Sequence, residues 1–273
     1  MSPSWRDRLL IGLAPERVAA VQLKRGLRPV LGIDVVRDVA ASSDDASAMP
    51  WAGALTALDE LLEGLGPVTG VASVILSSRF VRYGQVPWTD GVFAEGDRQA
   101  LAAGCFRAVH GDVVDRWRVT VDTPRYGCDN LAAAVDQALL DGLREILVQR
   151  RLRLAAVRPH LTAAFDRWRP QLLADDGGFV LVEPGCVTTL FRRGGQWAEV
   201  ANRRYGNAHE AAQIIRQCID ADRVRGGEGG VVVLAPGTVL ETETANDVSL
   251  RRLSGLGGPW PEDPWRSMAW SAA

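Results

Sequence analysis

Lysine is almost missing from this chain of 273 residues, although Lys and Arg together number 31. Lys24 is the single lysine, so the other side chains of this group are arginines. A P-loop needs a lysine that reaches the nucleotide phosphates, and a Schiff-base enzyme needs a reactive amine. The scarcity of lysine therefore argues against both classes of protein.

Paired cysteines and clustered histidines are also missing. Cys105, Cys128, Cys186 and Cys218 form no Cys-x-x-Cys pair, and the three histidines lie about 50 residues apart. Zinc sites need such ligands at short, regular spacing. The sequence therefore predicts no metal site, and each cysteine is expected to be a small buried side chain.

The chain has no apolar run of the length that a membrane span requires, roughly 18 to 20 residues. The N-terminal stretch MSPSWRDRLLIG holds no apolar core long enough for a signal peptide. The formal net charge is −2, which gives no general attraction to nucleic acid or to an anionic membrane surface. We expect a cytoplasmic protein with reduced thiols, no nucleic-acid partner and no direct membrane insertion.

Two further enzyme classes lack their signals. A serine hydrolase would carry a Gly-x-Ser-x-Gly turn, which is absent. Asp34, Asp122 and Asp136 are candidates for an acidic nuclease cluster, but Asp34 and Asp122 lie in alternating strand patterns where an outward carboxylate is ordinary. A nuclease is therefore disfavoured.

The residues that are present predict two halves that begin alike. Three strands joined by tight turns open each half, and helices and further strands follow. In the first half the strands are expected at 9–13, 17–24 and 28–40, and in the second at 178–185, 186–195 and 196–206. Asp175-Asp176-Gly177-Gly178 is the best linker candidate. We expect a first lobe at 1–174, a second lobe at 175–256 and a tail at 257–273 rich in Pro and Trp.

This duplicated opening is typical of the actin-like ATPase and ribonuclease H-like folds, so the expected fold class is a two-lobed α/β protein. Over about residues 8 to 240 the chain resembles the PilM, MshI and GspL cytoplasmic-domain family of type IV pilus and type II secretion assembly proteins. Three segments carry the resemblance: LIGLAPERVAAVQL is similar to that family's first phosphate loop, VRPHLTAAF to the end of its first lobe, and LVEPGCVTTLFRRGGQW to its second phosphate loop.

The first loop departs from the pattern of the nucleotide-binding relatives. The resemblance implies an aspartate, then a glycine, then a basic residue at the positions held here by Gly12, Ala14 and Ala19. The aspartate would hold Mg²⁺ or its waters, and the glycine would let backbone N–H groups approach a phosphate. Pro15 also removes a backbone donor from the turn. This loop is expected to have lost its chemistry.

The second loop keeps more of the pattern. The resemblance implies that Glu183, Gly185, Thr188 and Thr189 form a vestigial nucleotide-binding set, with Glu183 in the place of an aspartate. The ordinary alternative for Glu183, which lies at a strand end, is a solvated or hydrogen-bonded turn residue. In the third element, VVVLAPG, Pro236 and Gly237 form a turn without the paired glycines expected under an adenine.

The hypothesis from the sequence is thus a non-catalytic scaffold, a pseudo-ATPase with no bound cofactor. The resemblance implies as partners the cytoplasmic N-terminal segment of a small single-span inner-membrane assembly protein and a secretion ATPase. The protein would then lie at the inner membrane through its partner. The alternative is a nucleotide-binding or weakly active ATPase that uses ATP with Mg²⁺ through Glu183, and a third is an interaction domain outside pilus biology.

Tryptophan is unusually frequent, with nine residues. Aromatic residues and arginine are enriched at protein interfaces, so the tryptophans in loops and in the tail are expected to mark docking surfaces. These are Trp88, Trp197, Trp260, Trp265 and Trp270. The tail shows no helical or strand period, so we expect no regular element there but a segment pinned on a surface, either as a clasp on its own lobe or as a docking element.

Overall fold

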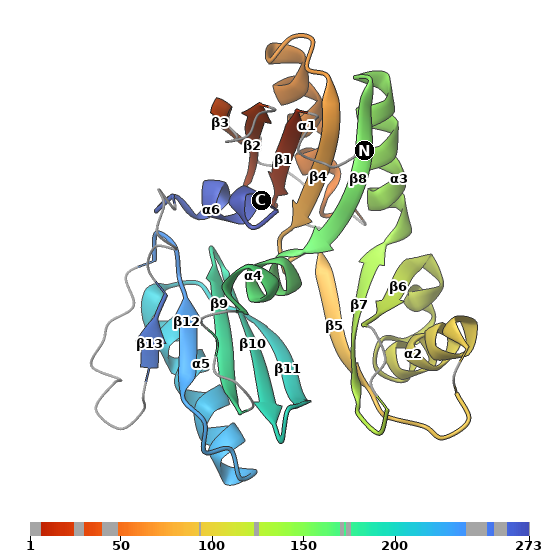
Figure 1. The fold of residues 1–273 in the computed structure, drawn as a ribbon, viewed down its shortest axis with the longest axis vertical. Coiled ribbons are helices and arrows are strands. Elements are labelled where there is room, and N and C mark those ends of the chain that lie inside the picture. Colours follow the sequence, from red (N-terminus) through yellow and green to blue (C-terminus); the bar gives the residue numbers. More distant parts are fainter. Residues whose placement is uncertain are drawn as a thin grey trace. The chain divides into compact units, whose positions relative to one another are not determined.

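The computed structural model of the chain describes residues 7–24, 30–39, 49–92, 94–122, 126–169, 172, 176–238, 250–253 and 261–272 (Figure 1). These residues form two compact units, each assembled from separate parts of the chain. The first unit comprises Met1–Phe80, Asp136–Arg167 and Trp260–Ala273, and the second comprises Val81–Val135 and Trp168–Pro259.

The first unit is built on a five-stranded sheet in the order β3-β2-β1-β4-β8. The first three strands form an antiparallel meander, whereas β1, β4 and β8 run parallel. Strand β1 is apolar at almost every position because both faces of the sheet are covered. The strands are β1 (Arg8–Leu13), β2 (Arg17–Lys24), β3 (Val30–Asp38), β4 (Gly70–Leu76) and β8 (Leu152–Pro159).

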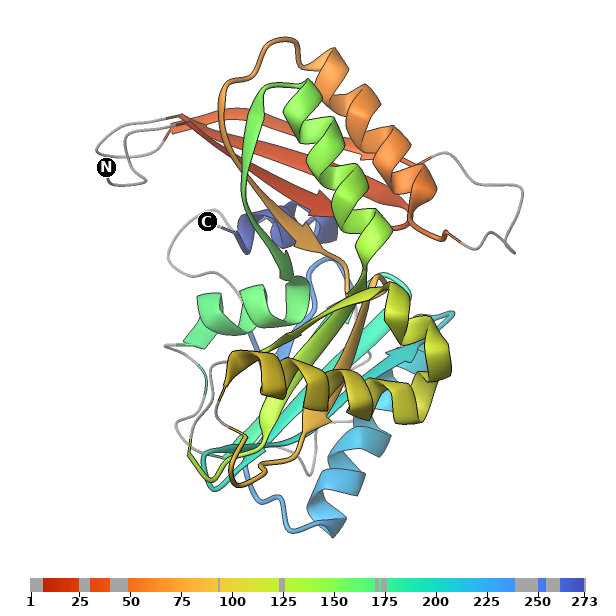
Figure 2. The same cartoon turned by 90° about the vertical axis from the view of Figure 1, so that its right-hand side faces the viewer.

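Two helices cover one face of this sheet, namely α1 (Ala52–Gly64) and α3 (Gln137–Gln149) (Figure 2). Helix α1 buries a stripe of leucine side chains (Leu55, Leu58, Leu61 and Leu62), and it contacts β2 and α3. Helix α3 begins where the side chain of Asp136 accepts a hydrogen bond from the backbone N–H of Ala138 (2.9 Å). Helix α4 (His160–Trp168) follows β8 directly.

The opposite face of the sheet is covered by α6 (Pro264–Trp270), which lies in the region predicted to be an irregular tail. Trp265, Met268 and Ala269 of this helix are buried against β1 and β2. The prediction of no regular element was wrong because Pro264 occupies the first helical turn, where proline needs no backbone donor. Asp263 caps the helix by accepting from the backbone N–H groups of the next two non-proline residues.

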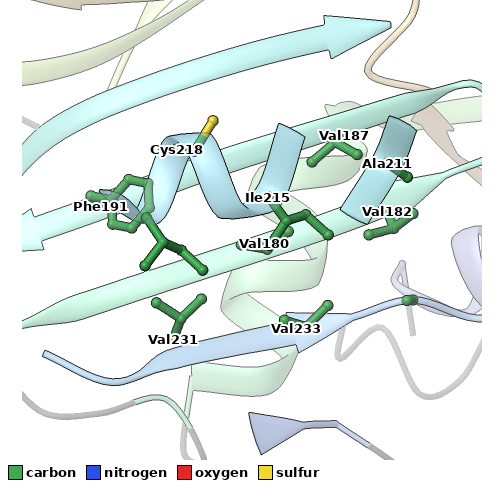
Figure 3. Close-up of a cluster of buried hydrophobic side chains, with 11 residues drawn as sticks. Val180, Val182, Val187, Phe191, Ala211, Ile215, Cys218, Val231 and Val233 are labelled. Atoms are coloured by element: carbon green, nitrogen blue, oxygen red, sulfur yellow. The ribbon is translucent and has the colours of Figure 1, made fainter. Parts of the chain in front are cut away.

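The second unit repeats the strand order of the first. Its main sheet runs β11-β10-β9-β12-β13, again an antiparallel meander of three strands followed by parallel pairings. Helix α5 packs on one face of it through a core of valine, isoleucine and phenylalanine side chains (Figure 3). The elements are β9 (Gly177–Glu183), β10 (Cys186–Arg193), β11 (Gln196–Arg204), α5 (Ala208–Val224), β12 (Val231–Leu234) and β13 (Leu250–Arg252).

A smaller three-stranded sheet, in the order β5-β7-β6, completes the second unit, and β5 contacts β11 of the main sheet. Helix α2 packs on this small sheet, with Phe106 and Ala102 in the core between them. The elements are β5 (Val81–Val86), α2 (Glu95–His110), the 3₁₀ helix η2 (Gly111–Arg116), β6 (Trp117–Val121) and β7 (Asn130–Asp136).

The repeated strand order confirms the expected fold class, an α/β protein with duplicated meander openings. The unit boundaries differ from the predicted split near residue 174, because Val81–Val135 groups with the second half of the chain. Strand β7, helix α3 and strand β8 follow one another along the chain, but β7 and β8 belong to different sheets. Asp175 and Trp260 lie outside the described residues.

Across the part of the chain that the structure describes, no helix combines the length and the apolar character needed to cross a membrane.

The burial of α6 leads to a first prediction. Replacing Trp265 by alanine should lower the free energy of unfolding by about 3–5 kcal/mol, because a large buried side chain leaves a cavity. Arg266→Ala is the matched control on the same helix, since it removes only a partly exposed ion pair with Asp34 (2.8 Å) and should cost at most about 1 kcal/mol. Urea unfolding followed by circular dichroism measures both; equal losses would show that α6 is not a clasp.

Candidate functional site

The first candidate loop is the β1–β2 turn. The backbone N–H of Ala14 donates to the carbonyl oxygen of Arg17 (3.0 Å), which closes the hairpin. Ala14 is fully buried and belongs to the core that contains α6. The turn offers one carboxylate, that of Glu16, and this carboxylate is ion-paired with Arg79 in the connection after β4. A carboxylate paired in this way is a poor ligand for Mg²⁺.

Gly12 lies directly beneath α6. A Cβ atom added to Gly12 would come within 3.1 Å of both the Cε of Met268 and the carbonyl oxygen of Trp265, and within 3.2 Å of the backbone nitrogen of Ala269. Position 12 is where the resemblance implies a metal-holding aspartate. With α6 in this place, any side chain at position 12 would have to displace α6 by a few tenths of an ångström or more, whereas glycine fits without displacement.

The second candidate loop is the β9–β10 turn at Pro184–Gly185. Gly185 adopts a left-handed backbone conformation with φ of 73°, which explains why glycine stands there. Tyr205, which directly follows β11, stabilises this turn. Its backbone N–H donates to the carbonyl oxygen of Gly185 (3.2 Å), and its side-chain hydroxyl donates to the carbonyl oxygen of Glu183 (2.9 Å). Burial raises the pKa of Tyr205, so the phenol stays a hydrogen-bond donor at neutral pH.

The structure separates the predicted binding residues. Glu183 pairs directly with Cys186 across the β9–β10 hairpin, and Thr188 shares the face of Cys186, with 3.8 Å between the thiol sulfur and the Thr188 hydroxyl. Thr189 is the next residue along β10, so it points to the opposite face, where the Cys218 thiol of α5 lies beside its hydroxyl. Thr189 therefore cannot act on the same ligand as Thr188.

The cysteines around this loop are structural. The Cys186 thiol is buried and donates to Oδ1 of Asn202 on β11 (2.6 Å). Burial raises the pKa of the Cys218 thiol, so it stays protonated and unreactive at neutral pH. Both side chains stabilise the sheet rather than supply a nucleophile.

Two arginines that the sequence patterns do not single out lie near the second loop. Arg204 on β11 is paired in register with Cys186 on β10. Arg82 of β5 lies close enough to interact electrostatically with both residues. Partial desolvation lowers the pKa of the Arg82 guanidinium, and the neighbouring charge of Arg204 lowers it further. No sequence motif identifies this pair, because β5 and β11 are more than one hundred residues apart in the chain.

The third candidate element follows β12. Gly237 has φ of 64°, and the backbone N–H of Thr238 donates to the carbonyl oxygen of Ala235 (3.4 Å), which forms a short turn. The described residues after β12 hold this single glycine, so they form no paired-glycine surface for a base to rest on.

The acidic residues weighed as a nuclease cluster have separate roles. Asp34 is ion-paired with Arg266, Asp136 caps α3, and Asp122 accepts a hydrogen bond from the indole N–H of Trp197 (3.4 Å). Within the described ranges, no three His, Cys, Asp or Glu side chains lie together in a way that could hold a metal ion.

Solved structures similar to this chain share its fold over nearly its whole length. A type IV pilus biogenesis complex, PilM–PilN, matches with a TM-score of 0.69 and 14% identity, covering 97% of this chain and 96% of that chain. The cytoplasmic domain of EpsL, an inner-membrane component of the type II secretion system of Vibrio cholerae, matches with a TM-score of 0.62 and 14% identity over 97% and 94% of the two chains.

A Bacteroides thetaiotaomicron protein of unknown function, described as having the actin-like ATPase fold, matches with a TM-score of 0.63 and 10% identity over 99% and 97% of the two chains. The chain matches no protein-family model and no curated protein. The structure therefore belongs to the class of actin-like ATPase folds, as the sequence predicts, and identities this low establish the fold alone.

The packing of Gly12 gives a second prediction. Gly12→Ala should lower the free energy of unfolding by about 1–3 kcal/mol, because the added methyl group overpacks the contact with α6. Gly64→Ala is the matched control: Gly64 ends α1, a Cβ there meets nothing within 4 Å, and the change should stabilise the protein by up to about 1 kcal/mol. Chemical unfolding compares the two variants, and a neutral Gly12→Ala would contradict the described packing.

Proposed function

We propose that this chain is a non-catalytic scaffold of a type IV pilus or type II secretion assembly platform, with a degenerate nucleotide site. The observation that carries the proposal is the cover of α6 over Gly12 and Ala14, the two positions where a working first phosphate loop would need its acid and its glycine. An actin-like protein without these groups lacks the metal-binding and phosphate-binding residues of its first loop.

The chemistry of the first loop supports this proposal. Mg²⁺ in nucleotide sites is held by carboxylates and water, and a phosphate is held by several converging backbone N–H groups. In the β1–β2 turn the N–H of Ala14 is used inside the hairpin, Pro15 has none, and the Glu16 carboxylate is paired with Arg79. The turn therefore offers few backbone donors or carboxylates that could bind an anion or a metal.

The pathway and the partners are proposed from the similar structures. One of them is a complex of PilM with PilN in type IV pilus biogenesis, and another is an inner-membrane component of type II secretion. By analogy, this chain would bind the cytoplasmic N-terminal segment of a small single-span inner-membrane assembly protein, and a secretion ATPase would be a further partner. It would then act in the cytoplasm, attached to the inner membrane through that partner.

The second candidate function is a nucleotide-binding or weakly active ATPase that uses Glu183. Arg82 and Arg204, two cations beside the second loop, favour this alternative because they could hold a phosphate group. Glu183 is buried, however, and Thr189 faces away, so fewer groups than the sequence indicates can reach one ligand. The scaffold remains the better-supported function.

Nucleotide affinity gives the third prediction. ATP with Mg²⁺ should bind with a dissociation constant no tighter than about 1 mM, a binding free energy of only about 4 kcal/mol. Titration calorimetry measures this. A micromolar constant that Arg82→Ala or Glu183→Ala abolishes would overturn the proposal in favour of the ATPase.

A fourth prediction separates a scaffold from an enzyme in the cell. In a strain of the source organism from which the gene is deleted, a Glu183→Ala copy should restore pilus assembly or secretion as well as the unchanged gene does, because no step depends on that carboxylate. The Trp265→Ala copy is the structural comparison and should restore less, since less folded protein accumulates. Failure of Glu183→Ala alone, at normal protein levels, would point to nucleotide chemistry.

A further inference from the structure

An aromatic and acidic surface lies at one end of the second unit, where β5 ends, β7 begins and the β10–β11 hairpin turns. The neighbouring ends of β5 and β7 can be followed in Figures 1 and 2. We call this surface the tryptophan patch. It consists of Trp88, Asp90, Asp122, Tyr126, Asp129 and Trp197.

The exposed part of the patch is an aromatic pair. The rings of Trp88 and Tyr126 meet edge to face with their centroids 5.2 Å apart, and Tyr126 is 81% exposed. The indole N–H of Trp88 donates to Oδ1 of Asp90 (3.0 Å). The Tyr126 ring is therefore open to solvent, beside the half-buried Trp88 and the carboxylate of Asp90.

Hydrogen bonds hold the Trp88 and Trp197 parts of the patch in place. Oδ1 of Asp129 accepts from the backbone N–H of Trp88 (2.9 Å), which fixes the chain just after β5. The side-chain amide of Gln85 donates to the carbonyl oxygen of Trp197 (2.6 Å), which ties β5 to the β10–β11 hairpin. A patch fixed in this way loses little conformational entropy when it binds a partner.

The patch already accommodates one cation of the chain itself. The guanidinium carbon of Arg192 lies 5.4 Å from the centre of the Trp197 ring, and the indole N–H of Trp197 donates to Asp122. An indole ring with a carboxylate at its N–H is thus shown to pack with an arginine. Trp88 and Asp90 repeat the same combination beside the exposed ring of Tyr126.

The charge of the patch points to a cationic ligand. Asp90 and Asp129 form no ion pair with any residue that the structure describes, and both carboxylates lie at the edge of the aromatic surface. Such a surface repels phosphates and anionic lipid headgroups and attracts arginine, whose planar guanidinium stacks on aromatic rings and hydrogen-bonds to carboxylates.

We propose that the tryptophan patch binds an arginine side chain of an extended segment in a partner protein. The inference rests on the proposed scaffold function, because it names the chemistry of one partner, but it uses no residue of either phosphate loop. It also gives a role to Trp88 and Trp197, which the sequence marks as docking residues. Trp265, by contrast, belongs to α6 and is buried against β1 and β2.

The test uses the full chain with ¹⁵N-labelled tryptophan side chains. The probe is a capped tripeptide with a central arginine between two leucines, and its control is the same peptide with citrulline, which keeps the shape and removes the charge. We expect saturable shifts of the indole N–H signals of Trp88 and Trp197 with the arginine peptide only. The buried Trp51 signal should not move.

Two variants locate the binding. Tyr126→Ala should weaken the arginine peptide about two- to fivefold by removing an aromatic face, and Asp90→Asn should weaken it by a similar factor by removing a charge. Val109→Ala and Asp112→Asn are matched controls, because they change an exposed apolar residue and an exposed acid elsewhere in the same unit. The controls should bind as the unchanged protein does.

Three results would overturn the proposal. The first is no saturable shift up to about 10 mM peptide. The second is equal binding of the citrulline peptide. The third is a concentration-dependent dimer of the unchanged protein that Tyr126→Ala abolishes, which would assign the patch to a second copy of this chain. None of these affects the nucleotide titration, so failure of the patch and failure of the scaffold proposal remain distinguishable.

Discussion

The contact between α6 and β1 is the constraint on which the first unit depends. It joins residues at the two ends of the sequence: Gly12 touches Trp265, Met268 and Ala269, and the Arg8 guanidinium donates to the carbonyl oxygen of Ala272 (2.7 Å). Because α6 covers one face of the sheet while α1 and α3 cover the other, β1 and β2 can be apolar on both sides. The same contact fills the space beside Gly12, where the resemblance implies an aspartate, and the scaffold that we propose rests on this packing.

The two units share one strand order, and each opens with a hairpin that resembles a phosphate loop in sequence. In the first, the hairpin remains and its turn is occupied by packing and by the Glu16–Arg79 ion pair. In the second, the turn contains Gly185, and Tyr205 donates hydrogen bonds to the carbonyl oxygens of Glu183 and Gly185. Each loop is thus stabilised by contacts inside its own unit, which agrees with the scaffold that we propose. Partner proteins would then bind to surface features such as the tryptophan patch, which includes no residue of either phosphate loop.

Much of the fold could be predicted from local patterns. Both meanders, the leucine stripe of α1 and the start of α5 at Asn207, whose side chain accepts from the backbone N–H of Glu210 (3.0 Å), follow from periodicity and capping. Helix α6 could not, because seven residues give no period and its burial depends on residues some 250 positions away. The candidate site was predicted less well. Strand alternation alone places Thr188 and Thr189 on opposite faces, whereas Arg82 and Arg204 meet only through tertiary packing.

The central claim is that the β1–β2 turn no longer grips a nucleotide, and backbone amide exchange tests it most directly. Hydrogen–deuterium exchange would be followed in the segments 8–17 and 183–189, with and without millimolar ATP and Mg²⁺. We predict the same protection of the first segment in both conditions. Its amides already form hydrogen bonds within the hairpin, and α6 already covers one of its faces. A clear rise in protection of both segments on adding nucleotide would contradict this prediction and show that each loop still responds to a nucleotide.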